Sequence, residues 1–144
     1  MDNMGKNFAA SYQKVQANTA SPAQRVVLVF KGICRHLETA VAAFDRPDDP
    51  QRFEQINNSI MLAEQLIMEL QIALDRERGG ELAQNLDRIY SFWRSHLSEG
   101  NVQKDRKKIA EILALVKDMT EGWIEAERIV RTGSGNQAPQ PPKQ

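Results

Sequence analysis

Apolar residues recur along most of this chain at alternating spacings of three and four, the pattern of amphipathic helices. Four such segments follow one another, and we predict helices over residues 22–44, 50–78, 81–99 and 103–131. Each apolar face must be buried against another helix. Because short connections make consecutive helices antiparallel, the pattern predicts an all-α fold, an antiparallel up-down four-helix bundle over residues 21–131.

The first helix has a clear start signal. Ser21 supplies a hydroxyl cap, Pro22 takes the first helical position, and Gln24 follows the cap by three residues as in a capping box. Its expected buried face consists of Val26, Phe30, Ile33, Leu37, Ala40 and Phe44. Gly32 costs up to about 1 kcal/mol relative to alanine in a helix interior. We therefore expect another backbone to pack closely against it.

The other three helices carry similar faces. They are expected to bury Phe53, Ile56, Ile60, Ala63, Ile67, Leu70 and Leu74 in the second, Leu82, Leu86, Ile89, Trp93 and Leu97 in the third, and Ile109, Ile112, Val116, Met119, Trp123, Ala126 and Val130 in the fourth. Residues 45–50, with two prolines and three aspartates, form the first turn. Gly79-Gly80 is expected to end the second helix, because glycine enters the left-handed region cheaply. The third helix is expected to stop at Gly100-Asn101.

The two ends of the chain differ from the bundle. Residues 1–20 are polar, but Phe8, Tyr12 and Val15 would share one face of a helix, so we expect a short segment that docks on the bundle. Residues 132–144 are rich in Gly, Ser, Gln and Pro, and we expect a disordered tail.

Composition limits the possible partners. Lys plus Arg equal Asp plus Glu at 19 each among 144 residues, which favours neither nucleic acid nor an anionic membrane. Cys34 is the one cysteine, which excludes an internal disulfide and fits a reducing cytoplasm. We see neither a secretory signal nor an apolar run near the roughly 18 residues of a membrane span. The sequence predicts a cytoplasmic protein without membrane insertion.

A metal or cofactor site is a common use of a helical bundle, and the sequence argues against one. Di-metal bundles need Glu-x-x-His pairs, whereas the residues three before His36 and His96 are Ile33 and Trp93. We recognise no phosphate-binding or dinucleotide-binding motif. The interpretation is a protein that is not an enzyme, with no metal and no cofactor.

Several apolar residues lie away from the predicted buried faces. Met61, Met68 and Ile72 fall more than about 90° from the second helix's buried face on an ideal helical wheel. The others are Tyr90 and Phe92 in the third helix and Leu113 and Ile124 in the fourth. Either they line the edges of a broad core, or they form an apolar surface for a partner, to which methionine adapts well.

The second and third helices are joined by a motif that resembles the flagellar secretion chaperones of flagellin, the FliS family. It reads Asp75-x-Glu77-x-Gly79-Gly80-Glu81-Leu82-Ala83-x-Asn85-Leu86-x-x-Ile89-Tyr90. The segment from Tyr12 to Pro22 resembles the family's N-terminal region, and Asn101-x-x-x-Asp105 resembles the entry to its last helix. The resemblance covers roughly residues 7–128. The chain has Phe30-Lys31-Gly32 where the family commonly has Tyr-Asp-Gly.

This resemblance implies a cytosolic chaperone that binds the C-terminal amphipathic segment of flagellin. It implies that the chaperone prevents premature polymerisation and that the chaperone–client complex reaches the flagellar export gate. The expected flagellin contacts are Tyr12, Met61, Met68, Ile72, Tyr90, Phe92, Leu113 and Ile124. We expect a monomer or homodimer, with residues 1–20 as a weak internal competitor for the client.

Two other classes stay open from the sequence. The first is a helical-bundle adaptor or oligomerisation domain of an unrelated assembly. The second is a small ligand-binding or metal-binding bundle.

Overall fold

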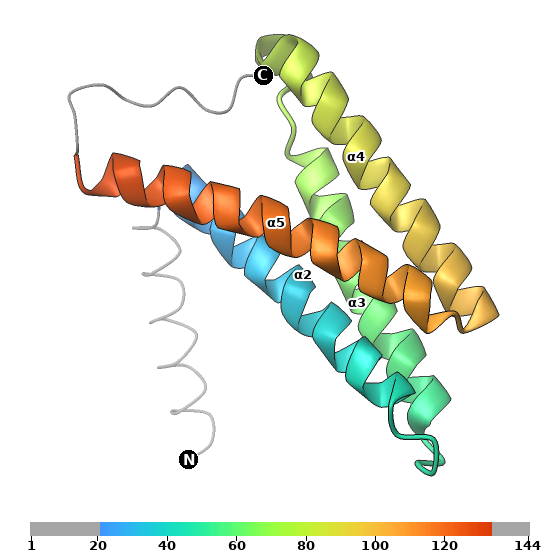
Figure 1. The fold of residues 1–144 in the computed structure, drawn as a ribbon. Coiled ribbons are helices and arrows are strands. Elements are labelled where there is room, and N and C mark those ends of the chain that lie inside the picture. The colour runs from blue at the N-terminus through green and yellow to red at the C-terminus, as the bar shows by residue number, and fades with distance from the viewer. Residues whose placement is uncertain (1–20, 134–144) are drawn as a thin grey trace, which may run out of the picture.

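The structure, a computed structural model, describes residues 21–133, which form four helices. These are α2 (Pro22–Phe44), α3 (Arg52–Ile72), α4 (Arg76–Gln103) and α5 (Arg106–Arg131) (Figure 1). The predictions for residues 1–20, including Tyr12, and for residues 134–144 lie outside the described residues.

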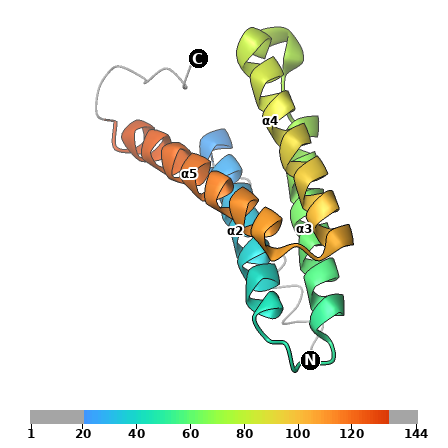
Figure 2. The same ribbon diagram turned by 45° about the vertical axis from the view of Figure 1, so that its right-hand side comes forward.

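The four helices form one ring. α2 packs against α3 and α5, and α4 packs against the same two helices from the other side. Consecutive helices run in opposite directions, so the predicted antiparallel up-down four-helix bundle is confirmed. The ring is uneven, however. α4 and α5 meet where a short turn joins them and diverge toward their other ends (Figure 1, Figure 2).

The core follows the predicted faces closely. Its fully buried side chains are Phe30, Ile33, Leu37, Ile56, Ile60, Ile67, Trp93, Leu97, Ile109, Ile112 and Val116. At its centre the ring of Phe30 lies 6.4 Å from Tyr90, 6.3 Å from Trp93 and 6.3 Å from Trp123, measured between centroids. These spacings are within the range of favourable aromatic pairs. One aromatic cluster therefore connects α2, α4 and α5.

Phe53 and Val130 were predicted to be buried, and the structure shows both as exposed. Each lies within one turn of a helix end, in α3 and α5 respectively, where the bundle no longer surrounds the helix. The guanidinium of Arg52 covers the Phe53 ring at 4.5 Å from its centroid. The predicted buried face is therefore correct in phase, but it was extended too far toward the ends of these two helices.

The start of α2 agrees with the sequence. Ser21 Oγ accepts from the Gln24 backbone N–H at 3.1 Å, and Gln24 Oε1 accepts from the Ser21 N–H at 2.9 Å. Gly32 is buried, and a Cβ there would lie 3.0 Å from Leu66 Cδ1. The expected close approach at Gly32 is present, but it is made by a side chain of α3 instead of a backbone.

The connection between α3 and α4 differs from the prediction. α3 ends at Ile72, and Asp75 starts α4 by accepting from the Arg78 N–H at 3.0 Å. The double glycine lies inside α4, where Gly80 has φ 52° and ψ −128° and produces a kink. A left-handed residue was expected here because glycine adopts it cheaply. Gly80 interrupts the first turns of α4, whereas α3 has already ended at Ile72.

The last connection also lies elsewhere than predicted. α4 continues through Gly100 to Gln103 and ends at Lys104, whose φ is 50°. Asp105 then caps α5 by accepting from the Lys107 N–H at 3.0 Å. Gly100 stays helical because its missing side chain makes room for α5, so it is a packing glycine and not a stop signal.

None of the helices within residues 21–133 is long and apolar enough to cross a membrane.

Candidate binding groove

An apolar groove of about 590 Å³ lies between α4 and α5. We call it the α4–α5 groove, and its lining residues are Arg88, Ile89, Phe92, Trp93, Leu115, Asp118 and Met119. Trp93 forms the floor and belongs to the aromatic cluster of the core. Phe92 and Leu115 are 51% and 45% exposed, so each offers apolar surface on its own wall. Ile89 and Met119 are partly buried and pack against the core between floor and walls.

The α5 wall is held to α2. Lys117 Nζ pairs with Glu38 Oε2 at 3.1 Å, and Gln24 Nε2 donates to Glu127 Oε2 at 3.2 Å. Thr120 is buried on the same side of α5. These contacts position α5 from the side opposite the groove.

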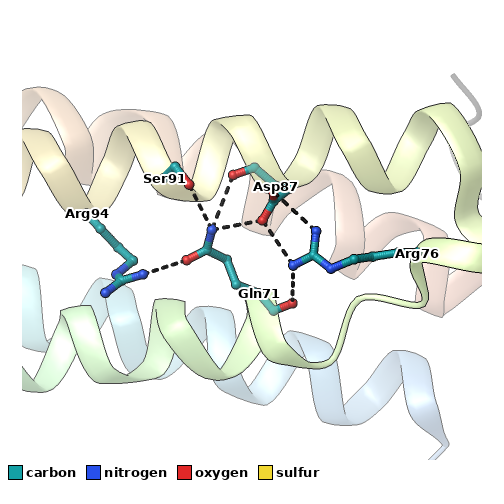
Figure 3. Close-up of polar contacts among 5 residues, drawn as sticks. All are labelled: Gln71, Arg76, Asp87, Ser91 and Arg94. Atoms are coloured by element: carbon teal, nitrogen blue, oxygen red, sulfur yellow. Dashed lines mark hydrogen bonds and ion pairs between the residues drawn. The ribbon is translucent and has the colours of Figure 1, made fainter.

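The α4 wall is held to α3 by a polar network centred on Gln71 (Figure 3). The Gln71 side-chain amide donates to Asp87 Oδ1 and Ser91 Oγ, both at 2.9 Å, and its carbonyl oxygen accepts from Arg94 at 2.9 Å. Arg76 Nη1 lies 3.2 Å from Asp87 Oδ2 and so ties the first turn of α4 to the same carboxylate. The groove thus lies between two helices that are each fastened to a different neighbour, α5 to α2 and α4 to α3.

Two carboxyl groups near the α3–α4 contact have pKa values shifted in opposite directions. Hydrogen bonds from Arg76 and then Gln71 lower the pKa of Asp87, because they stabilise the carboxylate. Burial raises the pKa of Glu64, and the nearby charge of Arg94 only partly opposes that effect. Arg94 Nε is buried with no hydrogen-bond partner in the part of the chain that the structure describes. The α3–α4 contact therefore contains partly buried polar and charged groups, unlike the apolar core beside it.

Near the short turn that joins them, α4 and α5 are fastened together by two ion pairs. His96 Nε2 lies 3.1 Å from Glu111 Oε1, and Lys108 Nζ lies 3.1 Å from Glu99 Oε1. The Phe92 ring stacks on the His96 ring with centroids 5.2 Å apart. Because His96 lies one turn beyond Phe92, this stacking fixes the aromatic side chain at the edge of the groove.

Among the predicted contact residues that fall within residues 21–133, Phe92 alone lines the α4–α5 groove. Tyr90 is 2% exposed in the core, where burial raises the pKa of its hydroxyl to about 12. Tyr90 therefore has almost no exposed surface with which to contact a partner. Leu113 is partly buried and Ile124 is exposed; both lie one turn from residues of α5 that contact α2, namely Lys117 and Thr120. They face away from the groove.

The predicted residues Met61, Met68 and Ile72 are all exposed on α3, and we call them the α3 stripe. Asn57 Nδ2 lies 3.5 Å from Met61 Sδ. The stripe shares an outward face of α3, as the helical wheel indicates, but it lies on a different helix from either groove wall. The structure thus presents two separate apolar surfaces where the sequence suggested one.

Leu115 and the two charged lining residues, Arg88 and Asp118, were not predicted from the sequence. Leu115 stands next to Val116, a buried-face residue, and four positions before Met119. The Leu115–Met119 spacing of four was the available signal, because it places both side chains on one face. Ile89, Trp93 and Met119 were assigned to the core, and the structure shows that they also form the groove.

The groove is lined mainly by apolar side chains, with one basic and one acidic residue among them. Residues 21–133 contain no group of three or more His, Cys, Asp and Glu side chains that could hold a metal. An open apolar groove between two helices, with charges at its rims, suits an amphipathic helix. Fold and site together therefore define a helical-bundle protein with an open apolar groove between its last two helices.

The comparison with known proteins identifies the family. The family model for flagellar protein FliS matches residues 4–130. Flagellar secretion chaperone FliSB of Pseudomonas aeruginosa is 35% identical over 116 residues, covering 78% of this chain and 89% of the relative. Flagellar secretion chaperone FliS of Bacillus subtilis is 28% identical over 133 residues, covering 90% and 96%. The chain belongs to the FliS family of flagellar secretion chaperones.

Proposed function

We propose that this protein binds the C-terminal amphipathic segment of flagellin in the cytoplasm. Binding prevents premature polymerisation, and the chaperone–client complex then reaches the flagellar export gate. The proposal involves no catalysis, no cofactor and no nucleic acid. Family membership supports the general role, and it sets aside the alternative of an adaptor in an unrelated assembly.

The α4–α5 groove is the observation that carries the proposal. Phe92 and Leu115 expose apolar surface on opposite walls, and Trp93 lies below them. An amphipathic helix places apolar side chains at positions i, i+3, i+4 and i+7, which suits a groove of this form. Full burial of a large apolar side chain contributes roughly 1.5–3 kcal/mol. The two half-exposed residues therefore cannot support micromolar binding by themselves, and further contacts are needed.

The α3 stripe remains a prediction for such further contacts. Met61, Met68 and Ile72 are exposed and lie outside the groove. A client segment that orders on binding can cover about 1,000–3,000 Å² and so reach more than one surface of a small bundle. In this proposal the groove is the principal site, and the stripe receives another part of the same client.

Isothermal titration with a synthetic flagellin C-terminal peptide tests the proposal. Phe92→Gln and Leu115→Gln should each weaken binding by about tenfold or more, because 1.4 kcal/mol of lost contact is sufficient. Val102→Gln is the matched control, since Val102 is 83% exposed on α4 and does not line the groove. No binding by the native chain would overturn the proposed function. Equal binding by all the variants would remove the groove from it.

A further inference from the structure

The two walls of the α4–α5 groove carry opposite charges. Arg88 lies on the α4 wall and Asp118 on the α5 wall. Arg88 Nη1 donates to the neutral amide oxygen of Asn85 at 3.1 Å, which leaves its positive charge unbalanced. Within residues 21–133 neither side chain takes part in an ion pair. The groove thus has one basic rim and one acidic rim.

Two neighbouring charged residues of α5 already take part in ion pairs. Lys117 pairs with Glu38 of α2, and Glu125 pairs with Arg128 at 2.6 Å within α5. Glu121, one turn beyond Asp118, is exposed and extends the acidic side of the helix. The charges at the groove are therefore those left available for a partner.

We propose that these rim charges fix the direction in which the client helix lies in the α4–α5 groove. This inference rests on the proposed function, and it adds a specific client chemistry. The client helix carries basic side chains on the flank that faces Asp118 and an acidic side chain on the flank that faces Arg88. Complementary charges across an interface contribute specificity and association rate more than affinity.

The argument for direction is geometric. A helix that lies with its apolar stripe on the groove floor has two flanks, and its sequence determines which flank is left and which is right. Turning the helix end for end exchanges the walls that these flanks face. Apolar contacts with Trp93, Phe92 and Leu115 distinguish the two directions poorly, because burial is non-directional. Walls of opposite charge distinguish them, whereas walls of like charge would not.

Charge-reversal variants of the full chain, with the flagellin C-terminal peptide as probe, test the inference. Asp118→Lys and Arg88→Glu should each slow association by about threefold to tenfold at low salt, and the difference should shrink as salt rises. Asp48→Lys and Lys31→Glu are matched controls, because they make the same charge changes at exposed positions of the α2–α3 connection and of α2, away from the groove and the α3 stripe. Unchanged melting temperatures show that the variants remain folded.

The direction itself is measured with a nitroxide on the peptide's N-terminus and methyl spectra of the bound chain. In the native chain the label should broaden either Leu86, toward the separated ends of α4 and α5, or Leu97, toward the joined ends, but not both. The double variant Arg88→Glu with Asp118→Lys should move the broadening to the other residue. Peptide binding that depends on Phe92 and Leu115 but ignores both reversals would overturn the inference and leave the proposed function standing. Absence of peptide binding to the native chain would overturn both.

Discussion

The joined end of the α4–α5 pair and the groove next to it differ in how completely they are packed. At the joined end, Leu97, Ile109 and Ile112 are all fully buried. In the groove, farther along both helices, Phe92 and Leu115 are about half exposed over a fully packed aromatic floor. The same two helices thus provide closed core where they are joined and open apolar surface at the groove.

This difference shows how a small bundle can keep an apolar surface open without losing its fold. Each wall of the groove is fastened to another helix, α4 through the Gln71 network and α5 through contacts with α2. The walls therefore need not close on each other to remain ordered. We infer that stability resides mainly at the joined end and binding in the groove.

The largest expected effect is the contrast between two leucine truncations. Leu97→Ala at the joined end should lower the free energy of unfolding by about 2–5 kcal/mol, because it leaves a cavity in a packed core. Leu115→Ala should lower it by less than about 1 kcal/mol, since its side chain is already partly in water. Chemical denaturation measures both values. Equal losses would show that the joined end and the groove share one core.

A pair of glycine substitutions sharpens the same contrast. A Cβ at Gly100 would lie 2.7 Å from Ile109 Cδ1 and 3.1 Å from Lys108 Cβ, whereas a Cβ at Gly122 would meet no atom within 4 Å. Gly100→Ala should destabilise the fold by about 1–3 kcal/mol through overpacking. Gly122→Ala should stabilise it by roughly 0.5–1 kcal/mol through helix propensity. Thermal melts giving the same sign for both substitutions would contradict the difference between the packed joined end and the open part of α5.

The polar α3–α4 contact predicts a pH dependence that the apolar core lacks. The pKa of Asp87 is lower in the folded state, so its stabilising contribution is present above the unfolded pKa of about 3.9 and is lost as pH falls through the folded pKa. Asp87→Asn should therefore flatten the acid side of the stability curve. The pKa of Glu64 is raised, so its contribution has the opposite sign and is lost as pH rises through the folded pKa. Glu64→Gln should steepen the loss of stability at low pH, and a Glu64→Gln curve as flat as that of Asp87→Asn would refute the assignment.

The smallest stability effect is expected on the α3 stripe. Met68→Gln with Ile72→Gln should change the free energy of unfolding by no more than about 0.5 kcal/mol per residue, because both side chains are exposed. Peptide titration of this double variant compares the stripe with the groove. Undiminished flagellin binding would remove the stripe from the client site, whereas a weaker complex with an unchanged melting temperature would place a second contact there.

The sequence predicted the fold well because most of the burial is periodic. Phe30, Ile67 and Val116 lie in the core as their spacing indicated. The errors fall at helix ends, where capping side chains and close packing at glycine compete with the hydrophobic periodicity in setting the boundary. Asp75 starts a helix before the double glycine can end one, and Gly100 serves close packing instead of a stop.

The candidate site was only partly predictable. Phe92 stood out as an apolar residue beside the buried face, and the structure places it in the groove. Tyr90 gave the same signal but lies in the core, because α4 turns that side chain toward Phe30. A helical wheel gives the direction of each side chain but not the angle between helices. The divergence of α4 and α5, which opens the groove at Leu115, is a property of the assembled bundle.

Site-specific photo-crosslinking in cells that produce flagellin tests the central claim most directly. A benzophenone amino acid at position 92 or 115 should capture the C-terminal segment of flagellin, because both positions face the α4–α5 groove. The same group at position 102, which is highly exposed on α4 outside the groove, should capture little or none. Capture from position 102 as strong as from 92 and 115, or capture only from positions 68 and 72 of the α3 stripe, would contradict the account.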